Sequence, residues 1–266
     1  MLHFHTDQPS LMNVTMMIRM SIAVFLAAAP VGGFAVEARG EMMTLNISND
    51  TYLRESAPDN NIGGHTHVAA GASGTLNRSR GLFLFDLTDV PAGSTVTSAT
   101  FRLDVVGLPS FNEVDSNFLL HRLLDDWGEG TKTGTNGMPA SSGDATWNSS
   151  KHQVELWSSA GGDFAATASA MTFVSGIASY VWSGAGLIAD IQAMVNDPIQ
   201  NFGWLLKTES EGTARTARRF GSLEGGSPAE LDVVFTPVPE PSGIFLVGIG
   251  LSYLFGKRRR CQDRNV

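Results

Sequence analysis

Apolar and polar residues alternate along much of the chain, most clearly over residues 95–106 (TVTSATFRLDVV). Every second residue from Ala99 to Val105 is apolar there, and the residues between them are polar or charged. A strand of an antiparallel sheet with one buried face has this period of two. Residues 80–87 (RGLFLFDL) are instead apolar on both faces, which predicts a central strand covered on both sides.

Shorter runs of the same kind, bounded by turn residues, predict further strands. These lie at 43–48, 51–54, 66–70, 117–123, 144–147, 203–207, 216–222 and 230–235. Residues 186–196 (GLIADIQAMVN) have apolar side chains at helical spacing and are followed by Asp197 and Pro198, which predicts one short helix. Stretches rich in Gly, Ser and Thr at 128–143 and 158–170 predict long loops. The whole pattern predicts an all-β, two-sheet jelly-roll-like sandwich with one short helix.

The first of two apolar runs at the chain ends lies within residues 1–38. It covers residues 22–35 (IAVFLAAAPVGGFA) and follows Arg19. A basic residue, a short apolar stretch and a small residue at the end predict a signal helix, cleaved after Ala38. Residues 1–15 then form an upstream leader, and translation starts near Met16 or Met20. The alternative is a membrane anchor, but the run is short and interrupted by Gly and Pro.

The second run lies within residues 237–266 and predicts a short transmembrane helix over 242–256 (SGIFLVGIGLSYLFG). A Pro-Glu-Pro motif precedes it, and a basic cluster that would stay on the cytoplasmic side follows it. These flanking residues are Pro239, Glu240, Pro241, Lys257, Arg258, Arg259 and Arg260. The order resembles the PEP-CTERM sorting signal of Gram-negative bacteria. The resemblance implies recognition by an exosortase in the inner membrane, cleavage near the motif, and release to the envelope, cell surface or exterior. The alternative is an ordinary C-terminal tail anchor.

Charge counts exclude one class of partner. The full chain has 18 Lys and Arg against 26 Asp and Glu. Without the two ends, residues 39–240 have 12 basic and 23 acidic residues, a net charge of −11. This balance argues against nucleic-acid binding, which needs clustered basic residues to displace counterions. The one cysteine, Cys261, lies in the C-terminal tail, so we expect the exported domain at 39–236 to fold without disulfides.

Ordered blocks within the 39–236 domain resemble DNRLRE-domain proteins. They are residues 48–55 (SNDTYLRE), 77–87 (NRSRGLFLFDL), 126–130 (DWGEG), 143–148 (GDATWN) and 201–206 (NFGWLL). The resemblance implies a β-sandwich related to carbohydrate-binding modules, some of which are similar to binders of alginate or other acidic polysaccharides. It does not imply catalysis.

Three tryptophans beside the Gly-rich loops are the candidate carbohydrate contacts: Trp127, Trp147 and Trp157. Sugars pack on flat rings whose polar edges stay in water. The alternative is that these rings cover the ends of the sandwich, as large aromatic side chains often do.

Loop carboxylates offer two further chemistries. Asp125, Asp126 and Glu129 could serve a polysaccharide-degrading enzyme, either a lyase or a glycoside hydrolase, which needs paired carboxylates. Nothing in the sequence sets one of them apart as a catalytic acid, so we expect no enzyme. Loop oxygens also suit a structural Ca²⁺ ion, but no spacing selects the ligands. Besides these loop carboxylates, Asp50, Asp59, Asn61 and Asp86 are equally possible donors.

Two groups of residues complete the candidates. His65 and His67 have a spacing that can bind zinc, although no third ligand is evident and an exposed edge strand is the simpler interpretation. Arg54, Arg80 and Asp86 lie in extended segments, which favours structural ion pairs. We therefore expect an exported, non-enzymatic envelope or matrix protein, either polysaccharide-binding or purely structural. An acidic domain would repel an acidic polymer unless Arg clusters or Ca²⁺ lay between them.

Overall fold

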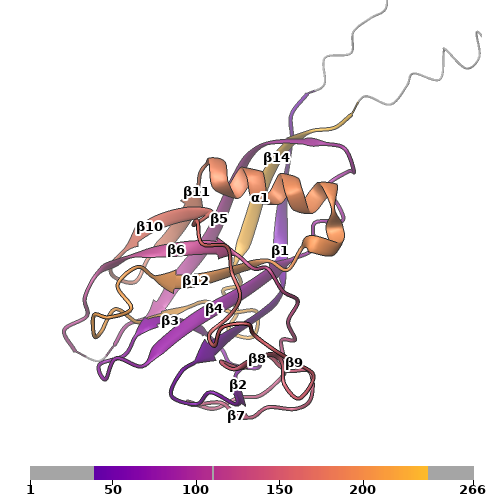
Figure 1. Ribbon diagram of the computed structural model, residues 1–266. Helices are drawn as coiled ribbons and strands as arrows, with labels where there is room; N and C mark the ends of the chain where they lie inside the picture. The colour runs from indigo at the N-terminus through magenta and orange to yellow at the C-terminus, as the bar shows by residue number, and fades with distance from the viewer. Residues whose placement is uncertain (1–38, 110, 239–266) are drawn as a thin grey trace, which may run out of the picture. The chain divides into compact units, whose positions relative to one another are not determined.

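The computed structural model describes residues 39–109 and 111–238; the predicted leader and sorting signal lie outside these ranges. The described chain is an antiparallel β-sandwich-like domain with one α-helix, which confirms the all-β prediction (Figure 1). The strands are β1 (Glu41–Arg54), β2 (Asn60–Asn61), β3 (Val68–Ala72), β4 (Arg78–Phe85), β5 (Thr95–Gly107), β6 (Ser116–Arg122), β7 (Met138–Pro139), β8 (Ser149–Lys151), β9 (Glu155–Leu156), β10 (Ala170–Val174), β11 (Ser179–Ser183), β12 (Trp204–Thr208), β13 (Arg218–Phe220) and β14 (Glu230–Thr236). The helix α1 spans Ala185–Asn196, as predicted, and a 3-10 turn η1 spans Pro198–Gln200.

Strand β1 belongs to both sides of the sandwich. Its first half pairs with β14, and after an irregularity between Ile47 and Asn49 its second half pairs with β4. The pairing runs from β1 through β14, β5, β13, β3 and β4 and then returns to β1. Strands β12, β6 and β10 continue from β4, and β11 adds to β5. The predicted strands 43–48 and 51–54 are therefore one long strand with a bulge.

The main hydrophobic core fills the space between the two sides. The alternating residues from Ala99 to Val105 on β5 all point into it, and each is at most 4% exposed. Helix α1 closes the core by packing its buried Leu187, Ile191 and Met194 against it (Figure 1). Burial of this apolar area is the main contribution to the stability of such a domain.

A second hydrophobic cluster lies on the other face of β4. Leu82 points into this cluster, whereas Phe83 points into the main core, so β4 is covered on both faces as predicted. The second cluster joins strand residues to a layer of loops from 123 to 164. Its buried members are Leu53, Leu82, Leu123, Trp127, Ala145, Trp147, Trp157 and Leu205.

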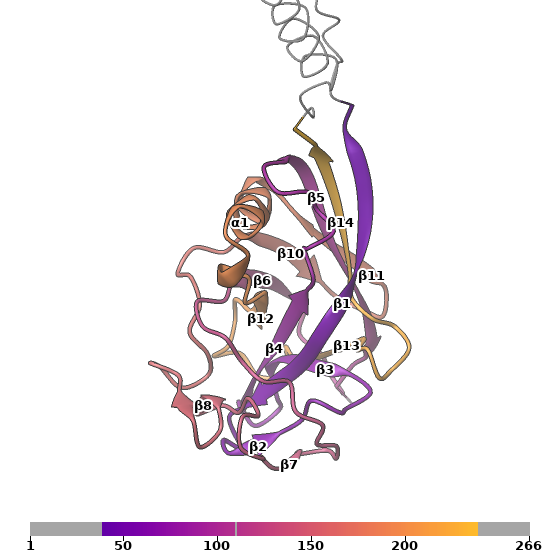
Figure 2. The same ribbon diagram turned by 90° about the vertical axis from the view of Figure 1, so that its right-hand side faces the viewer.

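The first and last described strands pair at one end of the domain. Glu41 of β1 lies opposite Phe235 of β14, and Val238 lies beside Gly93 in the β4–β5 loop. Residues 39 and 238 therefore leave the sandwich together, while β2, β7 and β8 lie at the opposite end (Figure 2).

Two sequence predictions about strands were wrong. Residues 144–147 form an irregular loop rather than a strand, in which the N–H of Ala145 donates to the carbonyl of Gly128 and Trp147 packs into the second cluster. Strands β10 and β11 were not predicted, since the large residues Met171 and Phe173 point outward at 54% and 60% exposure. In the described part of the chain, no helix has the length and hydrophobicity needed to cross a membrane. The predicted transmembrane helix at 242–256 falls outside that part.

Candidate functional site

A basic groove of about 490 Å³ lies where the second half of β1 meets β3 and β13. No Asp or Glu is among the described residues that line it, although residues 39–240 contain 23 acidic residues. We call it the basic groove. Its lining is Tyr52, Arg54, His65, His67, Ala69, Ser73, Gly74, Asn77, Ser79, Leu108, Pro109, Thr135, Ala217, Arg218 and Arg219.

Strand register brings these residues together from distant parts of the sequence. Tyr52 and Arg54 are two positions apart on β1 and therefore point to the same side. His65 and His67 lie in the segment just before β3. Arg219 of β13 pairs with Ala69 of β3, which places its side chain beside the two histidines. The groove therefore depends on the β13–β3 pairing.

The aromatic rings of the groove form one cluster. The Tyr52 and His67 rings stack with centroids 6.1 Å apart and an angle of 18°. The His65 and His67 rings meet edge to face, with centroids 4.2 Å apart. Tyr52 is only 2% exposed, whereas both histidines are partly exposed. The tyrosine therefore supports the histidines, which form the surface of the groove.

Two arginines of the groove have no carboxylate partner among the described residues. Arg54 donates from Nη1 to the carbonyl of Thr135 at 2.7 Å and from Nε to Ser56 Oγ at 3.0 Å. Arg219 is exposed and makes no ion pair with any described acid. A guanidinium without a counter-ion can bind carboxylate or phosphate oxygens in two-point contacts.

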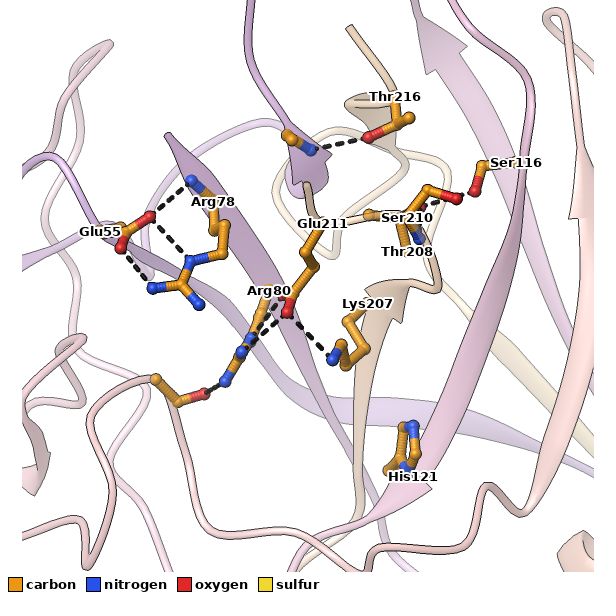
Figure 3. Close-up of polar contacts among 12 residues, drawn as sticks. Glu55, Arg78, Arg80, Ser116, His121, Lys207, Thr208, Ser210, Glu211 and Thr216 are labelled. Carbon is orange, nitrogen blue, oxygen red and sulfur yellow. Dashed lines mark hydrogen bonds and ion pairs between the residues drawn. The ribbon is translucent and has the colours of Figure 1, made fainter. Parts of the chain in front are cut away.

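Two arginines near Arg54 and Arg219 are neutralised by carboxylates. Arg80 contacts Glu211 through Nε at 2.8 Å and Nη2 at 3.0 Å, and Lys207 lies 3.0 Å from the same carboxylate (Figure 3). Arg78 pairs with Glu55 in the same view. The structural ion pair predicted for Arg80 is confirmed. The one predicted for Arg54 was wrong, because the backbone and a serine hydroxyl take its donors. Asp86 accepts from its own turn, at Thr88.

The histidines of the groove are uncharged at neutral pH. Burial, then the neighbouring His65 and then Arg219, lowers the pKa of His67 to about 4. Burial and Arg219 also lower the pKa of His65. The surrounding charges are positive. His65 and His67, whose spacing can bind zinc, therefore lie where a cation is repelled. Over residues 39–109 and 111–238, no group of three His, Cys, Asp or Glu residues is arranged to hold a metal.

The three candidate tryptophans lie in the second cluster, away from the groove lining. Trp127, Trp147 and Trp157 are 5–6% exposed. The indole N–H of Trp127 donates to the carbonyl of Phe202, and that of Trp157 donates to the carbonyl of Thr146. The guanidinium carbons of Arg78 and Arg80 lie 5.3 and 5.0 Å from the centre of the Trp147 ring. These rings cover the sheet beneath the loops.

The loop carboxylates are used in internal contacts. Glu129 accepts from the backbone N–H of Asp50 at 2.8 Å and from the side chain of Asn49 at 3.0 Å. Asp126 pairs with Lys151 Nζ at 2.8 Å, and Asp125 accepts from the backbone of Asp126. Asp125 also lines a separate hollow of about 480 Å³ near Glu155 and Asp163. Glu129 thus anchors a loop to β1, and Asp126 is held by an ion pair with Lys151.

Two buried polar residues matter more than the sequence indicated. Asn61 is fully buried and makes four hydrogen bonds, donating to the carbonyls of Glu129 and Ala145 and accepting from the N–H groups of Gly63 and Lys132. Asp50 is 1% exposed and accepts from the N–H of Leu223 at 2.8 Å. Burial raises the pKa of Asp50 to about 7. Both were only candidate calcium donors in the sequence, which gives no signal of their burial.

Comparison with known proteins does not assign the chain to a family. No protein family matches the chain, and no curated protein matches it either.

Proposed function

We propose that this chain is an exported, non-enzymatic protein of the bacterial envelope or extracellular matrix. In this proposal, an exosortase sorts it through residues 237–266, and a jelly-roll-like sandwich at 39–236 binds an acidic polysaccharide. The observation that carries the binding proposal is the basic groove. None of its described lining residues is a carboxylate, and Arg54 and Arg219 line it without a carboxylate partner in the described part of the chain.

The basic groove gives an acidic domain a positive surface on which an acidic polymer can bind. A domain of net charge −11 repels a polyanion at long range. At short range the charges nearest the ligand determine whether it is attracted. There the groove presents two guanidinium groups to a ligand carboxylate. Salt screens charges beyond roughly 8–10 Å, so the distant acids weaken binding less at physiological ionic strength.

The position of the groove supports the sorting part of the proposal. The described chain begins at β1 and ends after β14, which pairs with the start of β1, whereas Tyr52 and Arg54 lie near the end of β1. Tyr52 lies eleven positions after Glu41, roughly 35 Å along an extended strand. A chain attached through its C-terminal segment would therefore present the groove away from the attachment point. Processing at either end would also leave the groove untouched.

The binding test uses the full chain in a mild detergent and a panel of polyuronates and neutral glucans. We expect retention by polyuronates and none by neutral glucans. Arg219→Gln should weaken binding at least tenfold, since it removes a charge-assisted contact of about 1.5–3 kcal/mol. Arg102→Gln is the control, because it changes the net charge equally on an arginine that pairs with Glu230 and Asp232 outside the groove. Equal losses in both variants, or no retention on any glycan, would contradict the proposal.

Sorting has its own test. Mass spectrometry of the protein released by a producing cell should find a C-terminus near Pro239–Pro241. A released protein that still contains Phe255 and Arg260 would refute processing.

The degrading-enzyme alternative predicts a different result in the same panel. A lyase or hydrolase would release soluble oligosaccharides from at least one polymer. We expect none, because Asp126 and Glu129 are held in internal contacts.

A structural matrix module is the second candidate, and one surface favours it. Residues 164–189 contain no charged side chain, and β10 and β11 within this stretch expose Met171, Phe173 and Val181. Uncharged apolar edge strands are suited to pairing with another chain. Sedimentation of the full chain at rising concentration tests self-association. A Phe173→Asp variant that lowers the sedimentation coefficient would support this function, and a monomer at all concentrations would exclude it.

A further inference from the structure

His65 carries a buried polar atom that the protein leaves without a partner. No donor or acceptor among the described residues contacts its Nδ1 atom. An unpaired buried nitrogen is uncommon, because it loses its bond to water and gains nothing in return. The His67 ring lies against the His65 ring with centroids 4.2 Å apart, and both line the basic groove. The histidine that carries the unpaired nitrogen thus lines a ligand-sized cavity, although the nitrogen itself is covered.

Every charged side chain among the described residues that line the groove is positive. Strand β1 contributes Arg54, and β13 contributes Arg219. Arg218 also lines the groove, but Asp115 neutralises it at 2.9 Å. The other titratable neighbour is Tyr52, whose pKa is raised by burial, so it stays neutral. No carboxylate among the described lining residues is placed to accept a second N–H from either imidazole.

The acid nearest along β1 belongs to a different set of contacts. Asp50 accepts from Leu223, and its charged neighbours are Glu129 and Glu224. It does not line the groove. Its titration can therefore be separated from that of the histidines by substitution.

A bound carboxylate would change this balance. Negative charge within about 4–6 Å favours the protonated form of an imidazole. The proton would make His65 or His67 a charge-assisted donor to the ligand oxygen. By linkage, a ligand that promotes protonation binds more tightly when the proton is present, by the same factor.

We propose that the pair His65 and His67 takes up a proton when the basic groove binds a carboxylated polysaccharide, so that acid strengthens binding. This inference rests on the proposed function of the groove. The direction follows from the lowered pKa values of the free histidines. Both imidazoles are neutral near pH 7, and binding raises their proton affinity. Affinity is constant above neutral pH and rises as the pH falls toward 5, by up to about tenfold per pH unit for one proton.

The experiment measures the dissociation constant of the full chain for sodium polygalacturonate at pH 7.5, 6.5, 5.5 and 5.0, at fixed ionic strength. Its carboxylates stay ionised over this range. We expect binding at pH 5.5 to be at least tenfold tighter than at pH 7.5. Calorimetry at pH 6 in two buffers of different ionisation enthalpy gives the number of protons taken up. We expect a positive number, and zero uptake would overturn the inference in the unmodified protein.

Variants assign the proton to its residues. A His65→Asn, His67→Gln double variant should lose the acid enhancement, so that the ratio of its dissociation constants at pH 7.5 and pH 5.5 is close to one whatever its absolute affinity. His152→Gln, outside the groove, should keep the enhancement, and so should Asp50→Asn. Enhancement that persists in the histidine double variant would place the proton elsewhere and overturn the inference.

The two proposals fail differently. Measurable polyuronate binding that is independent of pH would refute the proton uptake and leave the binding function standing. Absence of binding at every pH would refute the binding function itself.

Discussion

Asp50 is a buried carboxyl group without a positive partner, and its replacement by Asn gives a sharp test of the structure. The side chain is 1% exposed, and the charges that act on it come from Glu129 and Glu224, which repel its anion. Burial is the largest cause of its raised pKa, about 7 against 3.8 for a free carboxyl. The folded state therefore holds this proton over a pH range in which the unfolded chain has already released it.

The effect on stability follows by linkage. Because the folded pKa is raised, the contribution of Asp50 is most favourable below about pH 4 and is lost as the pH rises to about 7. A difference of about three pKa units at about 1.4 kcal/mol each gives about 4 kcal/mol at pH 8. Asn removes the charge and keeps an oxygen that can accept from Leu223. Asp50→Asn should thus raise the free energy of unfolding by up to about 4 kcal/mol at pH 8 and by about zero at pH 4.

The assay is urea unfolding of residues 39–238, followed by tryptophan fluorescence, at pH 4, 6 and 8. Glu55→Gln is a control of opposite sign, since Arg78 lowers the pKa of Glu55 to about 2. Its loss should destabilise the domain at pH 8, by less than about 1 kcal/mol because the pair is partly exposed. Equal stability of wild type and Asp50→Asn at pH 8 would refute the claim that Asp50 is a destabilising buried anion at that pH.

Other predictions follow from the buried contacts and the groove. Asn61→Ala should cost about 2–4 kcal/mol in urea unfolding, since it leaves four backbone groups unpaired, whereas Asn60→Ala, which loses one exposed contact to Asn136, should cost less than about 1 kcal/mol. A loss below 1 kcal/mol for Asn61→Ala would contradict its role as the centre of the loop layer. Trp147→Ala should cost about 3–5 kcal/mol of stability and leave the polyuronate affinity of the folded protein unchanged, so a selective loss of affinity would contradict its covering role. Chelation with EDTA should leave polyuronate binding unchanged in calorimetry, because the arginines supply the positive charge, and loss of binding would show that Ca²⁺ is required.

The strands could be predicted where the buried face carried the large residues. On β5 the period of two was unambiguous, because large apolar residues point inward and polar residues point outward. On β10 the order is reversed, since the small Ala170 is buried and the larger Met171 and Phe173 are exposed. Alternation alone does not say which set faces the core. The strand predicted at 144–147 was wrong for another reason, because its apolar residues pack a loop layer that lies on the outside of a sheet.

The groove could be predicted only in part. The spacing of His65 and His67 indicated a pair, and the structure places the two rings together. The exposed edge strand expected there was wrong, because residues 65–67 lie in an irregular segment before β3. Arg219 lies more than 150 positions further along the chain, and only the pairing of β13 with β3 brings it to the same place. The sequence also does not reveal which arginines lack a partner. Arg54 and Arg80 lie in similar extended segments, yet only Arg80 meets a carboxylate, supplied by Glu211.

The central claim is that an acidic polysaccharide binds in the basic groove at the far end of β1. Backbone and side-chain NMR of ¹⁵N-labelled residues 39–238, titrated with a short oligogalacturonate, tests this claim most directly. We expect saturable shifts confined to one set of residues: Tyr52, Arg54, His65, His67, Arg219 and their neighbours. Saturable shifts centred on the hollow near Asp163, or no shifts at saturating ligand, would contradict it.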